Sequence, residues 1–416
     1  MAGTRHAVVA GIIAVCFTVV HVVAVSTLSS CSPPRNEAAS PFRIGHVAAL
    51  SGPAAPWGRS EQDSLNLILK SINDAGGVLG RRIELITLDS RSTPSGAADA
   101  ARRLIEENEV VAIIGPSQSS ACAAVARVTA SARIPFVATT ATHPSALLDS
   151  ASGRPYPTAF RVCPPDTHQG LAAAHFARDS LGLKTAGILY DPSSDYSVGL
   201  YEAFARRFAG LGGSVIPPEA VREGDKLGIS KGIGRLAEAG PDLLFLPLSP
   251  RDGAHAMRTA RERRLASVFI GADNWYSYDT GALAGNAGEG AYLVNLAAPD
   301  DPAVTGFVDL FKQTYGYQPL FPNAALAVDA LELLVDAIGR SGKAVLPRFP
   351  RLGKPSEKAS GEALLRALAE TKNLKTLTGS LTVHPTTHEP VQKQLVVQQM
   401  RGGRFVFVEK VRANAD

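Results

Sequence analysis

The chain has 416 residues, of which 45% are hydrophobic and 19% are charged, and its formal net charge is +4. This composition is typical of a globular protein that is long enough for two domains. Lysine and arginine are scattered among aspartate and glutamate, without a basic stripe that carries interleaved aromatic residues. The charge pattern therefore argues against nucleic-acid binding.

The N-terminus has the pattern of a secretory signal. A basic start precedes an apolar run from Ala7 to about Leu28, and small residues follow. The run ends in Leu28-Ser29-Ser30-Cys31, which resembles the bacterial lipobox, whose cysteine becomes the lipidated first residue. We therefore expect a signal peptide over residues 1–30 and a lipidated, proline-rich tether over 31–41. An uncleaved membrane anchor is the alternative, because the run is nearly long enough to span a bilayer.

Two cysteines, Cys122 and Cys163, remain beyond the N-terminal segment. An extracytoplasmic location would permit a disulfide between them, and their separation in sequence leaves that question open. No cysteine–histidine cluster has the spacing of a zinc site. His384 and His388 are interpreted as loop residues because Pro385 lies between them. The sequence thus predicts no metal and no cofactor.

The segment from Val110 to Pro144 predicts a βαβ unit. Its apolar runs, 110–114 and 134–137, suit strands that are buried on both faces of a parallel sheet, and the small residues of 121–132 suit a crossover helix. Each run ends in a hydroxyl-rich turn, and open α/β sheets bind ligands outside the carboxyl ends of their strands. Hydroxyls and helix N-terminal N–H groups suit a carboxylate. The hydroxyl residues are Ser117, Ser119, Ser120, Thr139, Thr140 and Thr142, each of which could instead be a cap or turn former.

The region before this unit continues the same pattern. A strand over residues 43–50 leads into a Gly/Pro-rich turn that holds Trp57, a candidate wall for a ligand or else a residue packed on its own domain. A helix over 60–75, a strand over 83–88 and a further helix from Ser92 follow. The resulting β-α-β-α-β-α-β order predicts a doubly wound sheet.

A second wound unit is predicted after residues 160–165, where a proline pair suggests a domain crossing. Asp166 and Gln169 resemble a capping box for the next helix. The expected elements are strands over 185–190, 243–248 and 267–271, a strand crossing back over 290–296, helices over 307–315 and 324–338, a surface loop over 341–360, and closing strands over 376–383 and 394–408. The ends of the first three strands carry Asp195 with Tyr196, Ser249, and Asp273.

Several short segments within residues 42–340 carry a family resemblance. They are Ser51-Gly52-Pro53, Ile72 to Arg81, Ile114-Gly115-Pro116, Ala141-Thr142-His143-Pro144, Phe160-Arg161, Leu189-Tyr190-Asp191, Ala239-Gly240-Pro241-Asp242, Gly288 to Tyr292 and Tyr315-Gly316. Together they resemble the branched-chain amino-acid-binding (leucine/isoleucine/valine-type) periplasmic solute-binding family of ABC transporters, in a lipoprotein form.

The resemblance implies an α/β fold of two doubly wound, Rossmann-like lobes joined by a three-strand hinge, the type I periplasmic binding protein fold. We expect lobe 1 over residues 42–162 and 291–382, and lobe 2 over 163–290 and 383–416. The resemblance also implies an exported protein that is anchored to the membrane through lipid on Cys31. Such a protein delivers a small molecule to an ABC-type permease and has no catalytic activity.

By the same resemblance, Ser119, Thr140 and Thr142 would hold the carboxylate of an amino acid. Tyr196 and Asp273 would close over the ligand and meet its ammonium group. Trp57 stands where the family often has tyrosine. Ser249 stands where amino-acid binders commonly carry aromatic residues, so an amide, urea or aromatic acid remains an alternative ligand.

Other classes of function compete with binding and transport as interpretations of the sequence. A hydrolase is disfavoured because no GxSxG motif or Ser–His pairing occurs, and a dinucleotide or P-loop site because no GxGxxG or GK[ST] motif follows a strand. A ligand-sensing module remains an alternative, because such sensors can share this fold.

Overall fold

The structure is a computed structural model that describes residues 40–276, 278–342 and 356–413. The predicted signal peptide and Cys31 lie outside these residues, as do residues 343–355 of the expected surface loop. Within the described part of the chain, no helix is both long and apolar enough to cross a bilayer.

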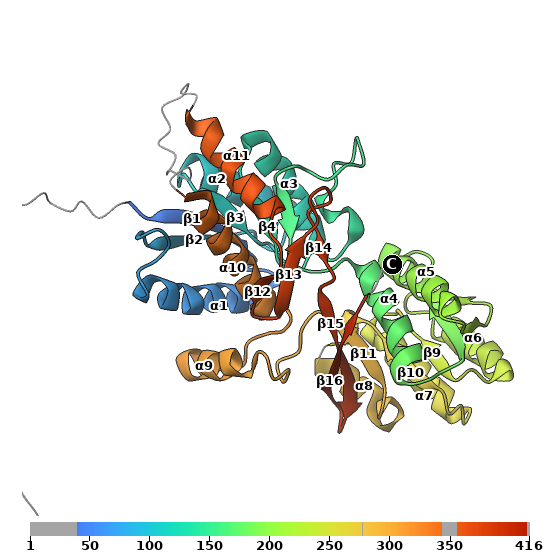
Figure 1. Cartoon of the computed structure of the whole chain (residues 1–416). Coiled ribbons are helices and arrows are strands. Elements are labelled where there is room, and N and C mark those ends of the chain that lie inside the picture. Colours follow the sequence, from blue (N-terminus) through green and yellow to red (C-terminus); the bar gives the residue numbers. More distant parts are fainter. Residues whose placement is uncertain (1–39, 277, 343–355, 414–416) are drawn as a thin grey trace, which may run out of the picture. The chain divides into compact units, whose positions relative to one another are not determined.

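The first sheet is entirely parallel, with the strand order β2-β1-β3-β4-β5 (Figure 1). Its strands are β1 (Phe42–Ala48), β2 (Ile83–Asp89), β3 (Ala112–Ile114), β4 (Phe136–Ala138) and β5 (Ala159–Arg161). The helices that connect or cover them are α1 (Ala55–Asp74), α2 (Pro94–Glu106), α3 (Ser119–Ala132), α9 (Thr305–Tyr315), α10 (Asn323–Ser341) and α11 (Ser356–Ala369). Helix α1 packs on α10, and α2 packs on α3. Because helices cover the sheet, strand residues such as Ile113 and Val137 are completely buried.

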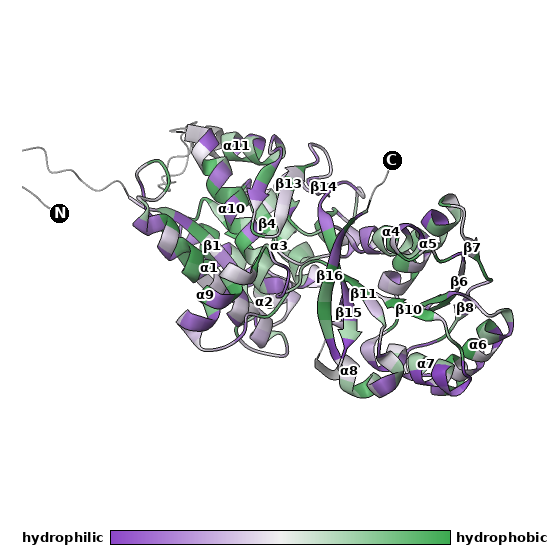
Figure 2. Cartoon of the chain, turned by 60° about the horizontal axis from the view of Figure 1, so that its bottom comes forward, coloured by the Kyte–Doolittle hydropathy of each residue, from purple (hydrophilic) through white to green (hydrophobic). Residues whose placement is uncertain are grey.

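The second sheet has the order β16-β15-β11-β10-β9-β6-β7, and β8 also pairs with β6. The pairs from β6 to β11 are parallel, whereas β15 and β16 add an antiparallel edge. Its strands are β6 (Thr185–Tyr190), β7 (Ser214–Val215), β8 (Glu219–Ala220), β9 (Leu243–Phe245), β10 (Val268–Gly271), β11 (Tyr292–Asn295), β15 (Gln394–Arg401) and β16 (Arg404–Arg412). The accompanying helices are α4 (Asp166–His175), α5 (Asp195–Gly210), α6 (Lys226–Ala239), α7 (Pro250–Glu262) and α8 (Tyr278–Ala284). Figure 2 shows hydrophobic residues along β10 and hydrophilic ones on α7, as expected for a sheet covered by helices.

The chain passes between the two sheets three times. It leaves the first sheet after β5, returns after β11 to form α10, and leaves again between β14 (Pro390–Val391) and β15. β14 belongs to a small antiparallel sheet with β12 (Leu374–Thr376) and β13 (Gly379–Val383), and β12 contacts α10. The predicted fold class, two doubly wound α/β units, is therefore confirmed.

Several element boundaries differ from those expected from the sequence, and three of the differences change how the chain is divided. Helix α1 begins at Ala55 rather than near residue 60, since Pro56 is compatible with a first helical turn, and Trp57 therefore lies on a helix rather than in a turn. Helix α11 begins at Ser356, inside the expected loop. Strand β11 pairs in the second sheet, so the return crossing follows Asn295, later than the expected lobe boundary at 291. The lobe boundaries themselves stay a prediction.

A buried ion pair fixes the last of the three crossings. Lys393, between β14 and β15, bonds through Nζ to the carboxylate of Asp329 on α10, and their side chains are 1% and 0% exposed. The Asp329 carboxylate also accepts the Thr378 backbone N–H at 3.0 Å. A desolvated charge is stable only with such partners. The start of this crossing is therefore held against α10.

We predict that Lys393→Met lowers the free energy of unfolding by about 3–5 kcal/mol, because it leaves the Asp329 carboxylate buried without its cation. Urea denaturation followed by circular dichroism measures this. The matched control is Lys70→Met, since Lys70 pairs with Asp74 on the exposed face of α1 and its loss should leave the midpoint unchanged. Equal effects of the two substitutions would contradict the prediction.

Candidate functional site

Hydroxyl residues in the turns after β3 and β4 form hydrogen bonds that connect the two turns. Ser119, at the first turn of α3, accepts the His143 backbone N–H on Oγ at 3.3 Å. The Thr140 hydroxyl donates to the Ser117 carbonyl at 3.3 Å and accepts from the Asn323 side-chain amide at 3.0 Å. The two turns predicted to face a ligand are thus brought together, and α10 supports them through Asn323.

Arg161, the last residue of β5, organises the second of these turns. Its side chain is completely buried, and Nη1 donates to the carbonyls of Ala141 and His143 at 2.9 and 3.0 Å. Nη2 forms an ion pair with Glu389, just before β14. The ring of His388 stacks on Phe160 with centroids 4.1 Å apart. The first and third crossings are therefore joined at the base of the turn that carries Thr140 and Thr142.

Tyr196 and Asp273 meet across the ends of two strands of the second sheet. Tyr196 lies on α5, after β6, and its hydroxyl donates to Oδ1 of Asp273 at 2.7 Å. Asp273 follows β10, and its backbone N–H donates to the Gln169 amide oxygen at 3.0 Å. Burial raises the pKa of Asp273, and burial together with the Asp273 charge raises the pKa of Tyr196. The predicted pairing of these two residues at one place is therefore observed, although their contact with a ligand stays a prediction.

Asp166 belongs to the candidate site, although the sequence pattern predicts only a role in helix capping for it. The predicted capping box is wrong: the N-cap of α4 is Pro165 and makes no side-chain cap bond. The buried Asp166 carboxyl instead accepts the Gln169 amide N–H on Oδ1 at 3.3 Å, and the Asp166 backbone N–H donates to the Thr142 carbonyl at 2.9 Å. Burial, followed by the nearby Asp273 charge, raises the pKa of Asp166 to about 7. Thr142 is thereby connected to the Tyr196–Asp273 pair.

Two other predicted site residues are not drawn into this network. Trp57 is 48% exposed on the first turn of α1 and, in the described part of the chain, makes no hydrogen bond or ring contact with the other predicted residues. Ser249 caps α7, since its hydroxyl accepts the Asp252 backbone N–H at 3.4 Å. Helix capping therefore accounts for Ser249. A role of Trp57 or Ser249 in ligand binding stays a prediction.

The sequence offered only weak signals for the residues it missed. A proline pair ahead of Asp166 marked a crossing, but a carboxylate at a helix start is ordinarily read as a cap. The Arg161–Glu389 contact joins residues 228 positions apart, a pairing that no local pattern contains.

Both described cysteines, Cys122 and Cys163, are free and buried, and burial raises the pKa of the Cys163 thiol to about 12. Such a thiol is inert toward nucleophilic chemistry near neutral pH. In the part of the chain that the structure describes, no group of three histidine, cysteine, aspartate or glutamate side chains is arranged to hold a metal ion.

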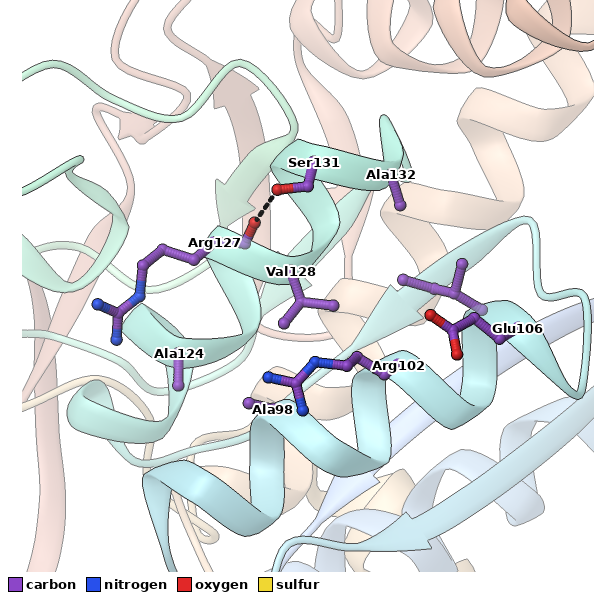
Figure 3. A pocket seen from close by; sticks show the side chains of 9 residues that line it. Ala98, Arg102, Glu106, Ala124, Arg127, Val128, Ser131 and Ala132 are labelled. Carbon is purple, nitrogen blue, oxygen red and sulfur yellow. Dashed lines mark hydrogen bonds between the residues drawn. The ribbon is translucent and has the colours of Figure 1, made fainter.

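A pocket of about 580 Å³ lies elsewhere, between α2 and α3 (Figure 3). Small side chains such as Ala98 and Ala124 form its floor, and the charged Arg102, Glu106 and Arg127 surround it. None of the predicted site residues lines it. We therefore place the candidate site at the strand ends rather than in this pocket.

Comparison with known proteins gives a consistent result. The model of the periplasmic binding protein family matches residues 41–404. A curated relative, Leu/Ile/Val-binding protein homolog 3 of Brucella melitensis, is 23% identical over 76% of this chain and 85% of its own length. The crystal structure of a leucine-binding protein from Thermotoga maritima is 27% identical, covers 89% of this chain and 98% of its own, and superposes with a TM-score of 0.67.

A second similar structure was solved with an aromatic acid. A solute-binding protein of an ABC transporter from Rhodopseudomonas palustris, solved with 3,4-dihydroxybenzoic acid, is 20% identical, covers 90% of this chain and 98% of its own, and has a TM-score of 0.66. At that identity the likeness concerns the fold alone. Since the family model spans most of the sequence and the observed sheets have the predicted doubly wound order, this chain belongs to the periplasmic binding protein family.

Proposed function

We propose that the chain is an extracytoplasmic solute-binding lipoprotein, not an enzyme, that captures a small amino-acid-like ligand between two lobes and delivers it to an ABC importer permease. The observation that carries the proposal is the division of polar groups between the strand ends of the two sheets. Hydroxyls and helix N–H groups gather at the first sheet, and the Tyr196–Asp273 pair lies at the second. This division suits the two ends of a zwitterion.

In this proposal the ligand carboxylate lies at Ser119, Thr140 and Thr142. The first turn of α3 begins at Ser119, so its N–H groups and the positive end of the helix dipole favour an anion there. The ligand ammonium meets Asp273, whose carboxylate accepts from Tyr196 and can accept from a cation as well. Trp57, half exposed on α1, would supply an apolar wall.

An aromatic acid is the second candidate ligand, because the Rhodopseudomonas palustris protein was solved with one. It has a carboxylate for the hydroxyl turns but no cation for Asp273. The ammonium-bearing ligand is therefore favoured by the carboxyl groups of Asp166 and Asp273, which an aromatic acid would leave without a cation. A sensing role of the same fold would use the same ligand contacts and would differ in the partner.

We predict that Asp273→Asn weakens the binding of L-leucine by at least about tenfold, because a charge-assisted hydrogen bond of roughly 1.5–3 kcal/mol is lost. Ser119→Ala should cost less, since the helix N–H groups remain. Isothermal titration calorimetry on the full chain in detergent measures both. The matched controls are Asp309→Asn, exposed on α9, and Ser131→Ala, exposed on α3, which should bind like the parent protein.

A thermal-shift screen of amino acids, amides and aromatic acids precedes this titration, because a bound ligand raises the apparent melting temperature by mass action. If the best binder carries an ammonium group and Asp273→Asn leaves its affinity unchanged, Asp273 is only a turn residue and the amino-acid assignment fails. Benzoate binding with no response to amino acids would favour the second candidate.

We predict that Cys31→Ser releases the protein from the membrane fraction, because lipid on Cys31 is the proposed anchor. Stable anchoring takes two or more acyl chains, which lipoprotein processing at this cysteine would supply. Fractionation of expressing cells, with Cys122→Ser as the control at a buried thiol, measures the change. Membrane association that survives Cys31→Ser would point to the uncleaved anchor instead.

A further inference from the structure

The carboxyl groups of Asp166 and Asp273 lie close together with no cation bonded to either among the described residues. Gln169 links them: its amide N–H group donates to Asp166, and its amide oxygen accepts the Asp273 backbone N–H. Tyr196 faces both, since each of the two charges raises the pKa of its hydroxyl. Asp166 is buried and Asp273 is partly buried.

Arg161 is the cation that approaches this pair, but its bonds are made elsewhere. Nη1 is bound to the carbonyls of Ala141 and His143, and Nη2 is paired with Glu389. The positive charge of Arg161 is therefore largely balanced by Glu389 rather than by the two aspartates. Two desolvated carboxylates without a cation repel each other, and such a pair retains a proton at pH values where isolated carboxyls are ionised.

We propose that Asp166 and Asp273 share one proton in the ligand-free protein and that the cationic group of the ligand takes the place of this proton. The inference rests on the proposed function, because both residues lie at the proposed ammonium end of the site. In the exchange, one O–H bond of a carboxyl group breaks, the proton passes to solvent, and an N–H⁺ group of the ligand donates to the carboxylate. The charge at the ammonium end of the site is thereby unchanged by binding, because one positive charge replaces another.

The groups around the pair support this assignment. From the first sheet, Thr142 and the positive charge of Arg161 lower the pKa of Asp166 without outweighing burial and the Asp273 charge. From the second sheet, the Tyr196 hydroxyl donates to the Asp273 carboxylate at 2.7 Å and lowers its pKa against burial. The charge of the neighbouring carboxylate raises the pKa of Asp166 but is no cause of the shift at Asp273, so Asp166 is the better holder of the proton.

The nearby histidines are separate candidates for any observed titration. Burial lowers the pKa of His168, which faces Glu389 and Arg161. His143 Nε2 lies 3.9 Å from the exposed Asp195 carboxylate. Among the described residues, neither ring is hydrogen-bonded to Asp166 or Asp273, so a variant at Asp166 separates the shared proton from effects of the histidines.

The exchange has a consequence for affinity. Because the pKa of Asp166 lies at about 7, the proton must be displaced below that pH and is already absent above it. The dissociation constant for L-leucine should therefore rise roughly 25-fold when the pH falls from about 7.5 to about 5.5. Asp166→Asn cannot hold the shared proton, and its affinity should change less than about threefold over the same range. Asp309→Asn should behave like the parent.

Calorimetry of L-leucine binding in phosphate and in Tris near pH 6.5 counts the proton directly. The parent protein should release between about half a proton and one proton per leucine, since a pKa of about 7 leaves Asp166 mostly protonated there. Asp166→Asn should release close to none. Leucine binding with no buffer dependence in the parent, or with equal proton release in both proteins, would overturn the exchange while leaving the proposed function standing.

A measurement without ligand keeps the proton testable if no amino acid binds. A carboxyl whose pKa is raised on folding contributes stability that is lost as the pH rises from its unfolded value, about 4, through its folded value. The parent should therefore lose about 2–4 °C more of its melting temperature between pH 5 and 8 than Asp166→Asn does. Parallel pH profiles for the two proteins would refute the shared proton, whereas failure of every amino acid to bind would refute the proposed function alone.

Discussion

The candidate site depends on the hydrogen bonds and the ion pair that the buried guanidinium of Arg161 forms. A buried charge requires partners, and this one takes two carbonyls from a single turn and a carboxylate from a segment more than two hundred residues away in the chain. Its planar fork fixes the directions of these partners together. The turn after β4 is therefore not a free loop, because the side chain that ends β5 holds its backbone from within.

This constraint also explains how the crossings can act as one unit. The backbone N–H of Arg161 donates to the His388 carbonyl, and His388 stacks on Phe160. Five residues beyond His388, Lys393 is bound to Asp329 on α10. On the other side, the Asn295 amide donates to Gln398 at 2.9 Å and joins the second crossing to the third. A hinge of the kind that the family resemblance implies would have to bend in the short stretches between these contacts.

Much of the fold could be predicted because it is encoded locally. Apolar runs such as 110–114 and the glycine or proline residues beside them mark buried strands and turns without any knowledge of distant contacts. The predicted start of α1 is too late because a Gly/Pro-rich segment favours a turn. Pro56, however, also fits the first turn of a helix. Local pattern alone does not decide between those two outcomes.

The site was only half predictable for a physical reason. Tyr196 and Asp273 follow strands of one sheet, so the rule that the carboxyl ends of parallel strands share an edge brings them together. Asp166 follows no strand of that sheet, and a carboxylate at a helix start has an ordinary role in capping. What distinguishes it is burial beside a second carboxyl, and burial arises from the packing of α4 on α5 and β11.

The arrangement gives a reason for placing unlike groups on different sheets. Hydroxyls and helix N–H groups are neutral, so the first sheet can expose them to water at little cost when no ligand is bound. The second sheet carries carboxyls, whose desolvation is costly unless a proton or a cation balances them. A zwitterion satisfies both sets only when it touches both, so its binding energy favours the conformation in which the two sets face one another. A ligand with only one charged end would satisfy one set and leave the other as it was, and it would favour that conformation correspondingly less.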